Sequence, residues 1–177
     1  MRIALISDLH GNAVALEAVL AHADRMGVDE TICLGDVATL GPRPREVVGM
    51  LRDRGCRCIL GNHDSAPNTD IGGEWVTEFS ADPFVFRHEA KQGALPGEIV
   101  GHHHPKASIP TRGTTVSRPC FVTDSRRLAM PAFGEYTGGL DVNDPAIKAL
   151  FPRGGRAFLL GKDRLYSFPL GAMRAAG

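Results

Sequence analysis

Residues 3–16 read Ile-Ala-Leu-Ile-Ser-Asp-Leu-His-Gly-Asn-Ala-Val-Ala-Leu, an apolar run that leads into Asp8 and His10 and then into a helical pattern. The apolar run predicts a buried strand. Asn12, followed by apolar residues at helical spacing, predicts a capped amphipathic helix, which Gly27 is expected to end. The stretch therefore predicts a strand, a loop that carries an acid and a histidine, and a helix in direct succession.

Polar motifs follow four further apolar runs, at residues 31–34, 58–60, 84–86 and 99–100. These motifs are Gly35-Asp36, Gly61-Asn62-His63-Asp64, Arg87-His88-Glu89 and Gly101-His102-His103-His104. In α/β sheets, sites form where loops leave the carboxyl ends of strands, so we expect the five motifs to converge on one rim. Their carboxylate, amide and imidazole donors suit Mn, Fe, Zn or Co better than Ca or Mg. Two such metals about 3.5–4 Å apart can activate water and neutralise phosphate oxygens, which is the design of a phosphoester hydrolase.

The ordered motifs D-x-H, G-D, G-N-H-[DE], H and G-H-x-H resemble those of the calcineurin-like metallophosphoesterase superfamily. The resemblance implies a hydrolase with two divalent transition-metal ions, Mn first and Fe, Zn or Co as alternatives. It assigns one metal to Asp8, His10, Asp36 and His104, and the other to Asp36, Asn62, His88 and His102, with Asp36 as the bridge. It also implies that His63 is the general acid, and adjacent Asp64 is expected to keep it protonated and oriented.

Each short motif has a simpler explanation when it is taken alone. A single Asp-x-His or Gly-Asp more often marks a turn or a helix cap than a metal site. The complete ordered set favours the metal site, and within it His88 depends on the shortest signal. His103 alternates away from its neighbours in an extended segment, so it is not expected to be a ligand.

Length and composition predict one globular domain at residues 1–170 and a short flexible tail at 171–177. The 20 basic and 20 acidic residues give a net charge of zero, so overall charge does not indicate a nucleic-acid partner. The sequence has neither a signal-like start nor an apolar run long enough to span a membrane, so we expect a cytoplasmic protein without a membrane partner. The cysteines are expected to be reduced and buried; they are Cys33, Cys56, Cys58 and Cys120.

The order of elements predicts a mixed α/β or α+β fold with a two-sheet β core flanked by helices, in αββα layers. The first third reads βαβαβ, with a second helix near residues 46–53, which implies parallel strands. Residues 65–83 are rich in Asp, Asn, Gly and Ser and are expected to form a surface loop near the site. The second half is expected to be mainly antiparallel and to end in a hairpin. Its strand candidates are residues 114–117, 121–123, 127–130, 157–160 and 165–168.

A second resemblance concerns the middle of the chain. Residues 86–89, 97–105, 117–121 and 128–142 are similar to the ligase-associated DNA damage response endonuclease family, whereas residues 35–48 look like the general bacterial phosphodiesterase branch. The first likeness implies DNA as the phosphodiester substrate and an association with DNA repair proteins. The second is compatible with smaller substrates.

Substrate contacts are expected from arginines beyond the last metal motif, because the guanidinium group matches phosphate oxygens. The sequence predicts one cluster, made of Arg112, Arg118, Arg126 and Arg127. The alternative is a solvated β-edge that carries charge against aggregation. Arg118 and Asn12 are the substrate-binding candidates, and Phe133 or Tyr136 could stack on a base unless they belong to the core.

The function predicted from these residues is a metal-dependent phosphodiesterase, acting as a DNA endonuclease in repair. One alternative has the same chemistry on small substrates, such as cyclic nucleotides or phosphomonoesters. The other is a catalytically silent scaffold of the same fold. The intact residues 61–64 argue against the scaffold, because they retain the acid histidine.

Overall fold

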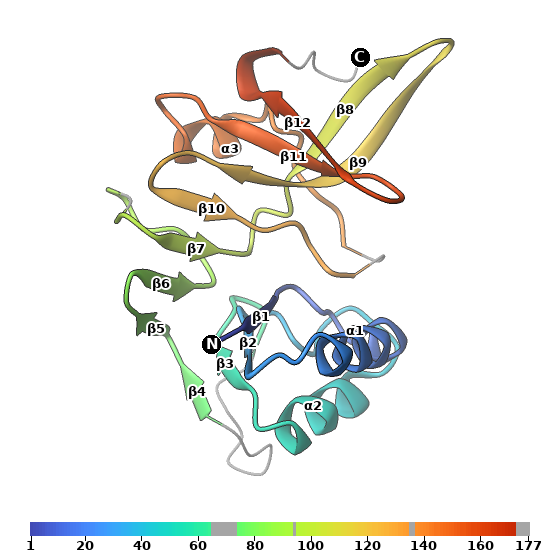
Figure 1. Ribbon diagram of the computed structural model, residues 1–177, viewed down its shortest axis with the longest axis vertical. Helices are drawn as coiled ribbons and strands as arrows, with labels where there is room; N and C mark the ends of the chain where they lie inside the picture. The colour runs from blue at the N-terminus through green and yellow to red at the C-terminus, as the bar shows by residue number, and fades with distance from the viewer. Residues whose placement is uncertain (65–73, 94, 135–136, 173–177) are drawn as a thin grey trace.

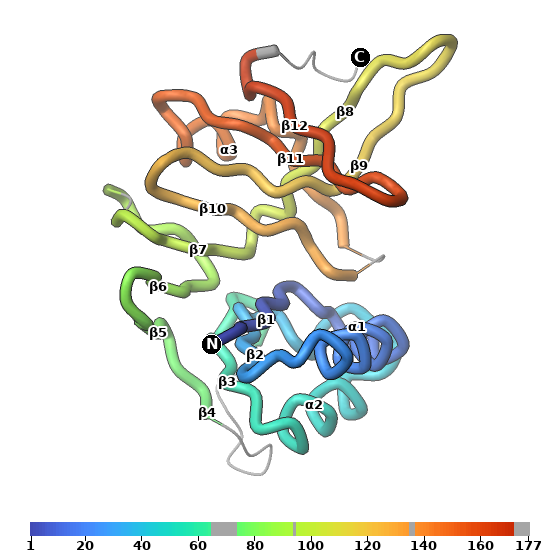
Figure 2. Tube along the Cα trace, in the orientation of Figure 1, coloured from blue at the N-terminus to red at the C-terminus, as the bar shows by residue number. Residues whose placement is uncertain are grey.

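Two β-sheets pack face to face between helices in the computed structural model, which describes residues 1–64, 74–93, 95–134 and 137–172 (Figure 1). The chain trace shows the N-terminal sheet with its two helices at one end of the molecule and the C-terminal sheet at the other (Figure 2). The expected αββα arrangement is confirmed. None of the helices in the described ranges is long and apolar enough to cross a bilayer.

The first sheet is parallel throughout and has the strand order β1-β2-β3-β4. Its strands are β1 (Ile3–Ile6), β2 (Glu30–Cys33), β3 (Arg57–Ile59) and β4 (Glu74–Val76). Helices α1 (Ala13–Arg25) and α2 (Pro44–Asp53) make the crossovers, as the sequence predicts. Asn12 caps α1, because its side-chain oxygen accepts the N–H of Ala15.

The second sheet is mixed, with the order β12-β11-β9-β10-β7-β6-β5. Its strands are β5 (Glu78–Ala81), β6 (Phe84–Arg87), β7 (Glu98–Val100), β9 (Thr114–Thr123), β10 (Arg127–Ala129), β11 (Arg156–Leu160) and β12 (Leu165–Pro169). Strands β6, β7 and β10 pair in parallel, and the other neighbours are antiparallel. The expected terminal hairpin is confirmed as β11–β12. Strand β8 (Lys106–Thr111) pairs with β9 off the main strand order, so these two form a second hairpin that extends away from the sheet (Figure 1).

Alternation along the strands divides the core into three layers. Cys33 faces α1 and α2, whereas Ile32 and Leu34 face the second sheet, where they meet Phe86 and Ile99. The short helix α3 (Pro145–Leu150) covers the outer face of the second sheet, and η2 (Leu170–Ala172) follows β12. All four cysteines are free and buried, as expected, and burial raises the pKa of Cys56 and Cys120 to about 12.

Two expectations differ from the structure. The loop expected at 65–83 is wrong for residues 74–81, which form β4 and β5 because Trp75 packs under the helices and Phe79 stacks on Phe86 at 5.9 Å. Residues 65–73 lie outside the described part. The two strand candidates within 114–123 are one continuous strand, β9. Of the expected tail, Gly171 and Ala172 belong to η2, and 173–177 lie outside the described part.

Candidate metal centre

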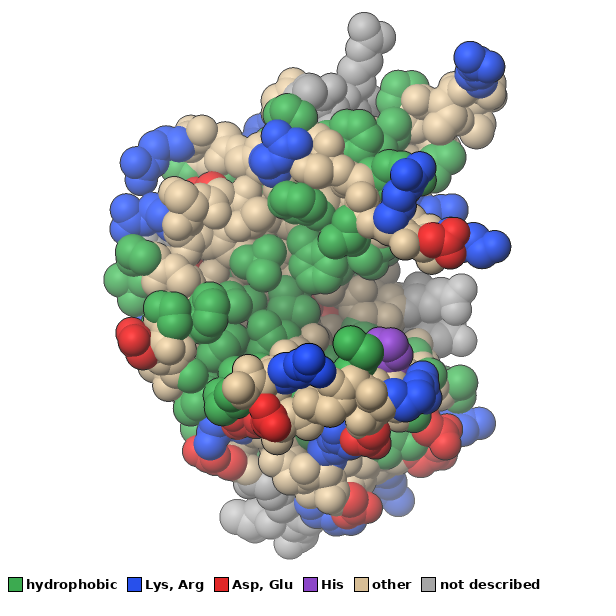
Figure 3. Space-filling model, viewed as in Figure 1, with side chains coloured by type: hydrophobic (Ala, Val, Ile, Leu, Met, Phe, Trp, Pro, Cys, Tyr) green, Lys and Arg blue, Asp and Glu red, His purple; other side chains and the backbone are tan. Residues whose placement is uncertain are grey.

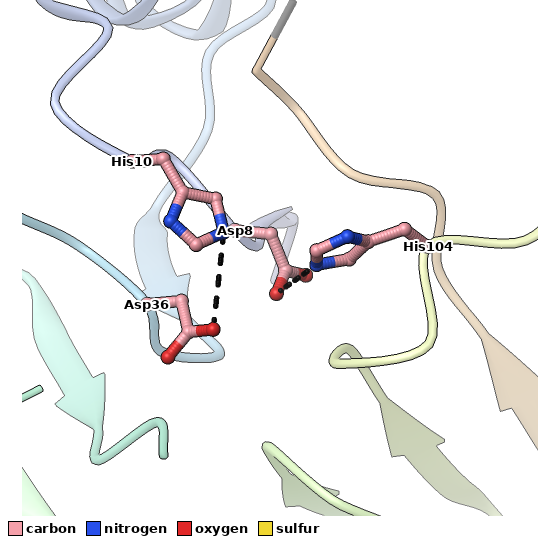
Figure 4. Close-up of side chains that lie close together, drawn as sticks. All are labelled: Asp8, His10, Asp36 and His104. Atoms are coloured by element: carbon pink, nitrogen blue, oxygen red, sulfur yellow. Dashed lines mark hydrogen bonds and ion pairs between the residues drawn. The ribbon is translucent and has the colours of Figure 1, made fainter. Parts of the chain in front are cut away.

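Four side chains point toward one another at the junction of the two sheets (Figure 4). Their ligand atoms all lie within 4.8 Å of one another, and the four are Asp8, His10, Asp36 and His104. The His104 Nε2 atom lies 2.8 Å from Asp8 Oδ1, and His10 Nε2 lies 3.8 Å from Asp36 Oδ2. Two carboxylates and two imidazoles around one point form a donor set that suits a divalent transition metal.

The hydrogen bonding and the protonation state of the His10 ring also suit a metal ligand. Its Nε2 atom is buried and has no hydrogen-bond partner among the residues that the structure describes. An unpaired buried nitrogen is costly, and a metal ion would satisfy it. Burial lowers the pKa of His10 despite the charges of Asp36 and Asp8, so the ring is held in the neutral form that binds metals.

A second group lies on the other side of Asp36. The His88 Nε2 atom is 2.9 Å from Asn62 Oδ1 and 3.5 Å from Asp36 Oδ2, and His102 Nδ1 is 3.0 Å from the same amide oxygen. His88 donates its Nδ1–H to the carbonyl of Leu34 at 2.8 Å, and this bond orients the ring so that Nε2 faces the oxygens of Asn62 and Asp36. The structure thus brings all seven predicted ligands together, with Asp36 between the two groups.

The electrostatics of Asp36 and His88 are coupled. Burial disfavours the charged form of both groups. Hydrogen bonding and charge attraction between them outweigh that effect, so the pKa of Asp36 is lowered and the pKa of His88 is raised. Asp36 is therefore ionised at neutral pH, the form in which a carboxylate binds metal ions.

The ligands come from both sheets, so the expectation of a single rim was wrong. Strands β1, β2 and β3 belong to the first sheet, whereas β6 and β7, which precede His88 and His102, belong to the second. Face-to-face packing of the two sheets brings their strand ends together. Backbone hydrogen bonds then join the loops: the N–H of His10 donates to Asp36 at 2.9 Å, and the N–H of Gly101 donates to His88 at 3.0 Å.

Most of the ligands adopt a strained backbone conformation. Five of them have positive φ angles: Asp8 57°, His10 44°, Asp36 53°, His102 67° and His104 46°. Non-glycine residues in this region cost on the order of 1 kcal/mol or more each, and such strain gathers at functional sites. The strain is compatible with a stable fold only because the loop contacts above hold it in place.

Two motif glycines allow the loops to approach the ligand carboxylates. A Cβ atom added to Gly61 would collide with the carboxylate and amide nitrogen of Asp36. One added to Gly101 would collide with the Ser7 hydroxyl and lie 2.8 Å from Asp8 Oδ2. The glycines in these two motifs are therefore required by close contact with the ligands.

The expected catalytic pair is differently arranged. His63 is exposed, and its ring centroid lies 5.9 Å from that of His10, so it borders the site without joining the ligand set. Asp64 was expected to orient His63, but its carboxylate instead accepts backbone N–H groups from Gly61 at 2.9 Å and from Asp36 and Val37 at 2.8 Å. Asp64 therefore ties the loop after β3 to the loop after β2. His63 is held through its own backbone N–H, which donates to Asp36 Oδ1 at 3.0 Å.

The expected cluster of four arginines does not form. Arg127 is buried and donates to Glu98 at 2.5 Å and to the Lys91 carbonyl at 2.7 Å, so it belongs to the interior of the second sheet. Arg112 lies at the exposed tip of the β8–β9 hairpin. Arg118 is exposed on β9 and lines a cleft of about 430 Å³ that also contains His104.

The same cleft contains a cation that the sequence reasoning missed. Lys106 lines it beside Arg118, and the available signal was its position two residues after the last ligand, at the start of a strand. Phe133 packs against the core under the helices, which favours the core alternative for it, and Tyr136 lies outside the described residues. Asn12 uses its side-chain oxygen to cap α1, and the expected contact between Asn12 and the substrate stays a prediction.

Comparisons with known proteins support this description. The family model for calcineurin-like phosphoesterases matches residues 1–118. An uncharacterised protein of Methanocaldococcus jannaschii is 45% identical over 62 residues, which are 35% of this chain and 26% of that protein. This chain therefore aligns with about a quarter of that curated relative.

Solved structures extend the likeness over nearly the whole chain. The nuclease MPE of Pseudomonas putida is 28% identical with a TM-score of 0.67, and the match covers 94% of this chain and 87% of that one. Yfce, a phosphoesterase from E. coli, shares the fold at 20% identity, with a TM-score of 0.56 over 98% of this chain and 96% of that one. The match of residues 1–118 to the family model shows that the chain belongs to the calcineurin-like phosphoesterase family.

Proposed function

We propose that this protein is a phosphodiesterase with a dinuclear metal centre and that its substrate is DNA. The observation that carries the proposal is the pair of ligand groups on either side of buried Asp36, together with the unpaired Nε2 of His10. One group would hold a metal near His104, and the other would hold a metal near His88. Mn²⁺ is the ion that we expect in both, because the donors combine oxygen and nitrogen without a thiolate.

The two metals, when bound, activate water and neutralise the charge on the phosphate oxygens. His63 is exposed beside the ligands and can donate a proton to the departing oxygen. The backbone N–H of His63 donates to Asp36 Oδ1, so the residue that would carry the acid is anchored to the carboxylate between the two ligand groups. Lys106 and Arg118 can bind a neighbouring phosphate in the cleft beside His104.

DNA as the substrate, and a role in DNA repair with repair proteins as partners, are supported by two likenesses. The middle of the chain resembles the ligase-associated endonuclease family, and the protein of known structure from Pseudomonas putida is described as a nuclease. The cations in the cleft beside His104 agree with a substrate that carries more than one phosphate.

A second candidate is a phosphoesterase of small substrates, such as cyclic nucleotides. It is favoured by the net charge of zero and by the burial of Arg127, which leaves fewer cations for a polyanion. The two candidates share the same metal chemistry and differ in how much of the substrate touches the protein beyond the reacting phosphate.

An activity panel distinguishes them. The protein with added Mn²⁺ would be given single-stranded DNA, double-stranded DNA, 2′,3′-cyclic AMP, an aryl phosphodiester and an aryl phosphomonoester, with a chelator-treated control. Our proposal predicts metal-dependent cleavage of DNA and of the aryl phosphodiester. Cleavage of cyclic AMP or the monoester at far higher kcat/KM than DNA would replace it with the second candidate.

A further inference from the structure

Two clefts meet at Arg118. The first is the cleft beside His104, which Lys106, Ser117 and Arg118 line. The second is a more apolar groove of about 340 Å³ between the β8–β9 and β11–β12 hairpins, which we call the hairpin groove. Its walls include Ile109, Val116, Leu159, Tyr166 and Phe168, and Arg118 lines both clefts. A chain-like ligand that leaves the metal centre past Arg118 would therefore enter the hairpin groove.

The hairpins that form the groove are strongly basic. Residues 106–120 and 156–169 contain six Lys or Arg and a single acid, Asp163, although the whole chain has a net charge of zero. Lys and Arg side chains gather at the tips of the two hairpins in the space-filling view (Figure 3). This concentration of positive charge favours a polyanion as the ligand.

An aromatic ring is held in place at the wall of the groove. Tyr166 is 44% exposed, and the guanidinium of Arg164 lies 4.9 Å from its ring centroid. The ring also packs against the turn at Gly161, where an added Cβ would lie 2.5 Å from Tyr166 Cε2. These contacts limit the rotamers of Tyr166, so the ring loses little conformational freedom on binding, and its exposed part lines the groove, where a base can stack on it.

We propose that the hairpin groove binds the unpaired bases of a single-stranded nucleic acid whose backbone passes Lys106 and Arg118, with Tyr166 stacking on a base. This inference rests on the proposed phosphodiesterase function and specifies its substrate as a single strand. A groove that offers phosphate contacts first and an apolar, aromatic wall next suits an unpaired strand, because only unpaired bases present their faces for stacking.

The two cations that line the cleft on the His88 side, Arg87 and Lys91, are both paired with acids. The cleft that contains Asn62 and His88 is also lined by Glu89 and Lys91. Lys91 is paired with Glu78 at 2.8 Å, so its charge is already compensated. The longer part of the bound strand is therefore assigned to the Arg118 side.

Binding can be measured without catalysis, by fluorescence anisotropy of a labelled oligonucleotide about 12 nucleotides long with chelator-treated protein. We expect Tyr166→Ala to weaken binding about 5- to 150-fold, as the loss of one base–aromatic stack does, and Tyr166→Phe to bind like the wild type. Arg118→Ala should weaken binding and reduce the slope of log K against log salt by about 0.7. Arg153→Ala, which removes an exposed charge outside the groove, is the matched control and should change only nonspecific affinity.

An oligonucleotide with abasic positions tests the stacking itself. It should bind the wild type as weakly as the intact oligonucleotide binds Tyr166→Ala, and the substitution should cause no further loss. A duplex of the same length should bind more weakly and be insensitive to Tyr166→Ala. Equal affinity of Tyr166→Ala and the wild type for the intact single strand would overturn the groove assignment. So would an equal loss of affinity, caused by Tyr166→Ala, for the intact strand, the duplex and the abasic strand.

Hydrolysis of an aryl phosphodiester with Mn²⁺ separates this inference from the proposed function. If the protein hydrolyses the aryl ester but Tyr166→Ala changes neither the binding nor the cleavage of oligonucleotides, the groove assignment fails and the function stands. If no phosphodiester is hydrolysed, the proposed function fails. Binding that depends on Tyr166 would then still support the groove as a nucleic-acid site.

Discussion

His63 is the residue whose role differs most from that of its neighbours, because it borders the metal centre but is exposed and is not part of either ligand group. We predict that His63→Ala leaves the metal content unchanged and lowers turnover of a nucleotide diester by about 10²–10⁴-fold, the usual contribution of a general acid. The loss should be smaller for an aryl ester, whose leaving group needs little protonation. Metal content by plasma mass spectrometry and kcat on both substrates check this. If His63→Ala loses metal together with activity, His63 is a metal ligand and the general-acid role is wrong.

Asp64 has a structural role that is distinct from proton transfer. Its carboxylate accepts three backbone N–H groups, and two of them belong to the loop that carries Asp36. Asp64→Ala should lower the free energy of unfolding by about 2–4 kcal/mol, because buried donors are left without a partner. It should also weaken metal binding, since the two loops separate. Urea unfolding of the metal-free protein measures the first effect. A change below about 1 kcal/mol, with a shifted pH profile of kcat, would return Asp64 to the role of orienting His63.

Among the elements, the loops that follow β1, β2 and β3 determine the shape of the site, and glycine is essential where they touch. We predict that Gly61→Ala lowers metal affinity by at least about tenfold, because the new methyl group displaces the Asp36 carboxylate. Gly49→Ala is the control: outside the helix's own backbone, no described atom lies within 4 Å of the Cβ that the substitution adds, and in helix α2 it should stabilise the protein by about 0.5–1 kcal/mol. Isothermal titration with Mn²⁺ compares the two. If Gly61→Ala binds Mn²⁺ with the affinity of the wild type, the loop can shift to accommodate the methyl group without displacing Asp36, and the prediction is wrong.

The sequence best predicts the elements whose signals lie within their own segment of the chain. The apolar run at Ile3–Ile6 predicts β1, and the Asn12 cap with the apolar spacing after it predicts α1. Both signals lie within the element itself, and both predictions are correct. Strands β4 and β5 were missed because their stabilising contacts are distant: Trp75 under the helices and Phe79 on Phe86. Arg127 was misjudged for the same reason, since its partner Glu98 lies on another strand.

At the scale of the whole molecule, the packing of two sheets against each other creates the metal centre. The ligand order was readable from the sequence because each ligand follows an apolar strand. Which sheet each strand joins was not readable, because apolar runs such as residues 84–86 and 99–100 do not specify their pairing partners. The clefts beside the centre were also hidden, since Arg118 lies between Lys106 and Tyr166 only because β9 of one hairpin pairs with β11 of the other.

The central claim is that two metals, held on either side of Asp36, make this protein a phosphodiesterase. The most direct measurement is the rate of aryl phosphodiester hydrolysis as chelator-treated protein is titrated with Mn²⁺, with bound metal counted at each point. Our account predicts no activity without metal and a rate that reaches its maximum as the second equivalent binds. Full activity in the metal-free protein, or no hydrolysis with both equivalents bound, would contradict it.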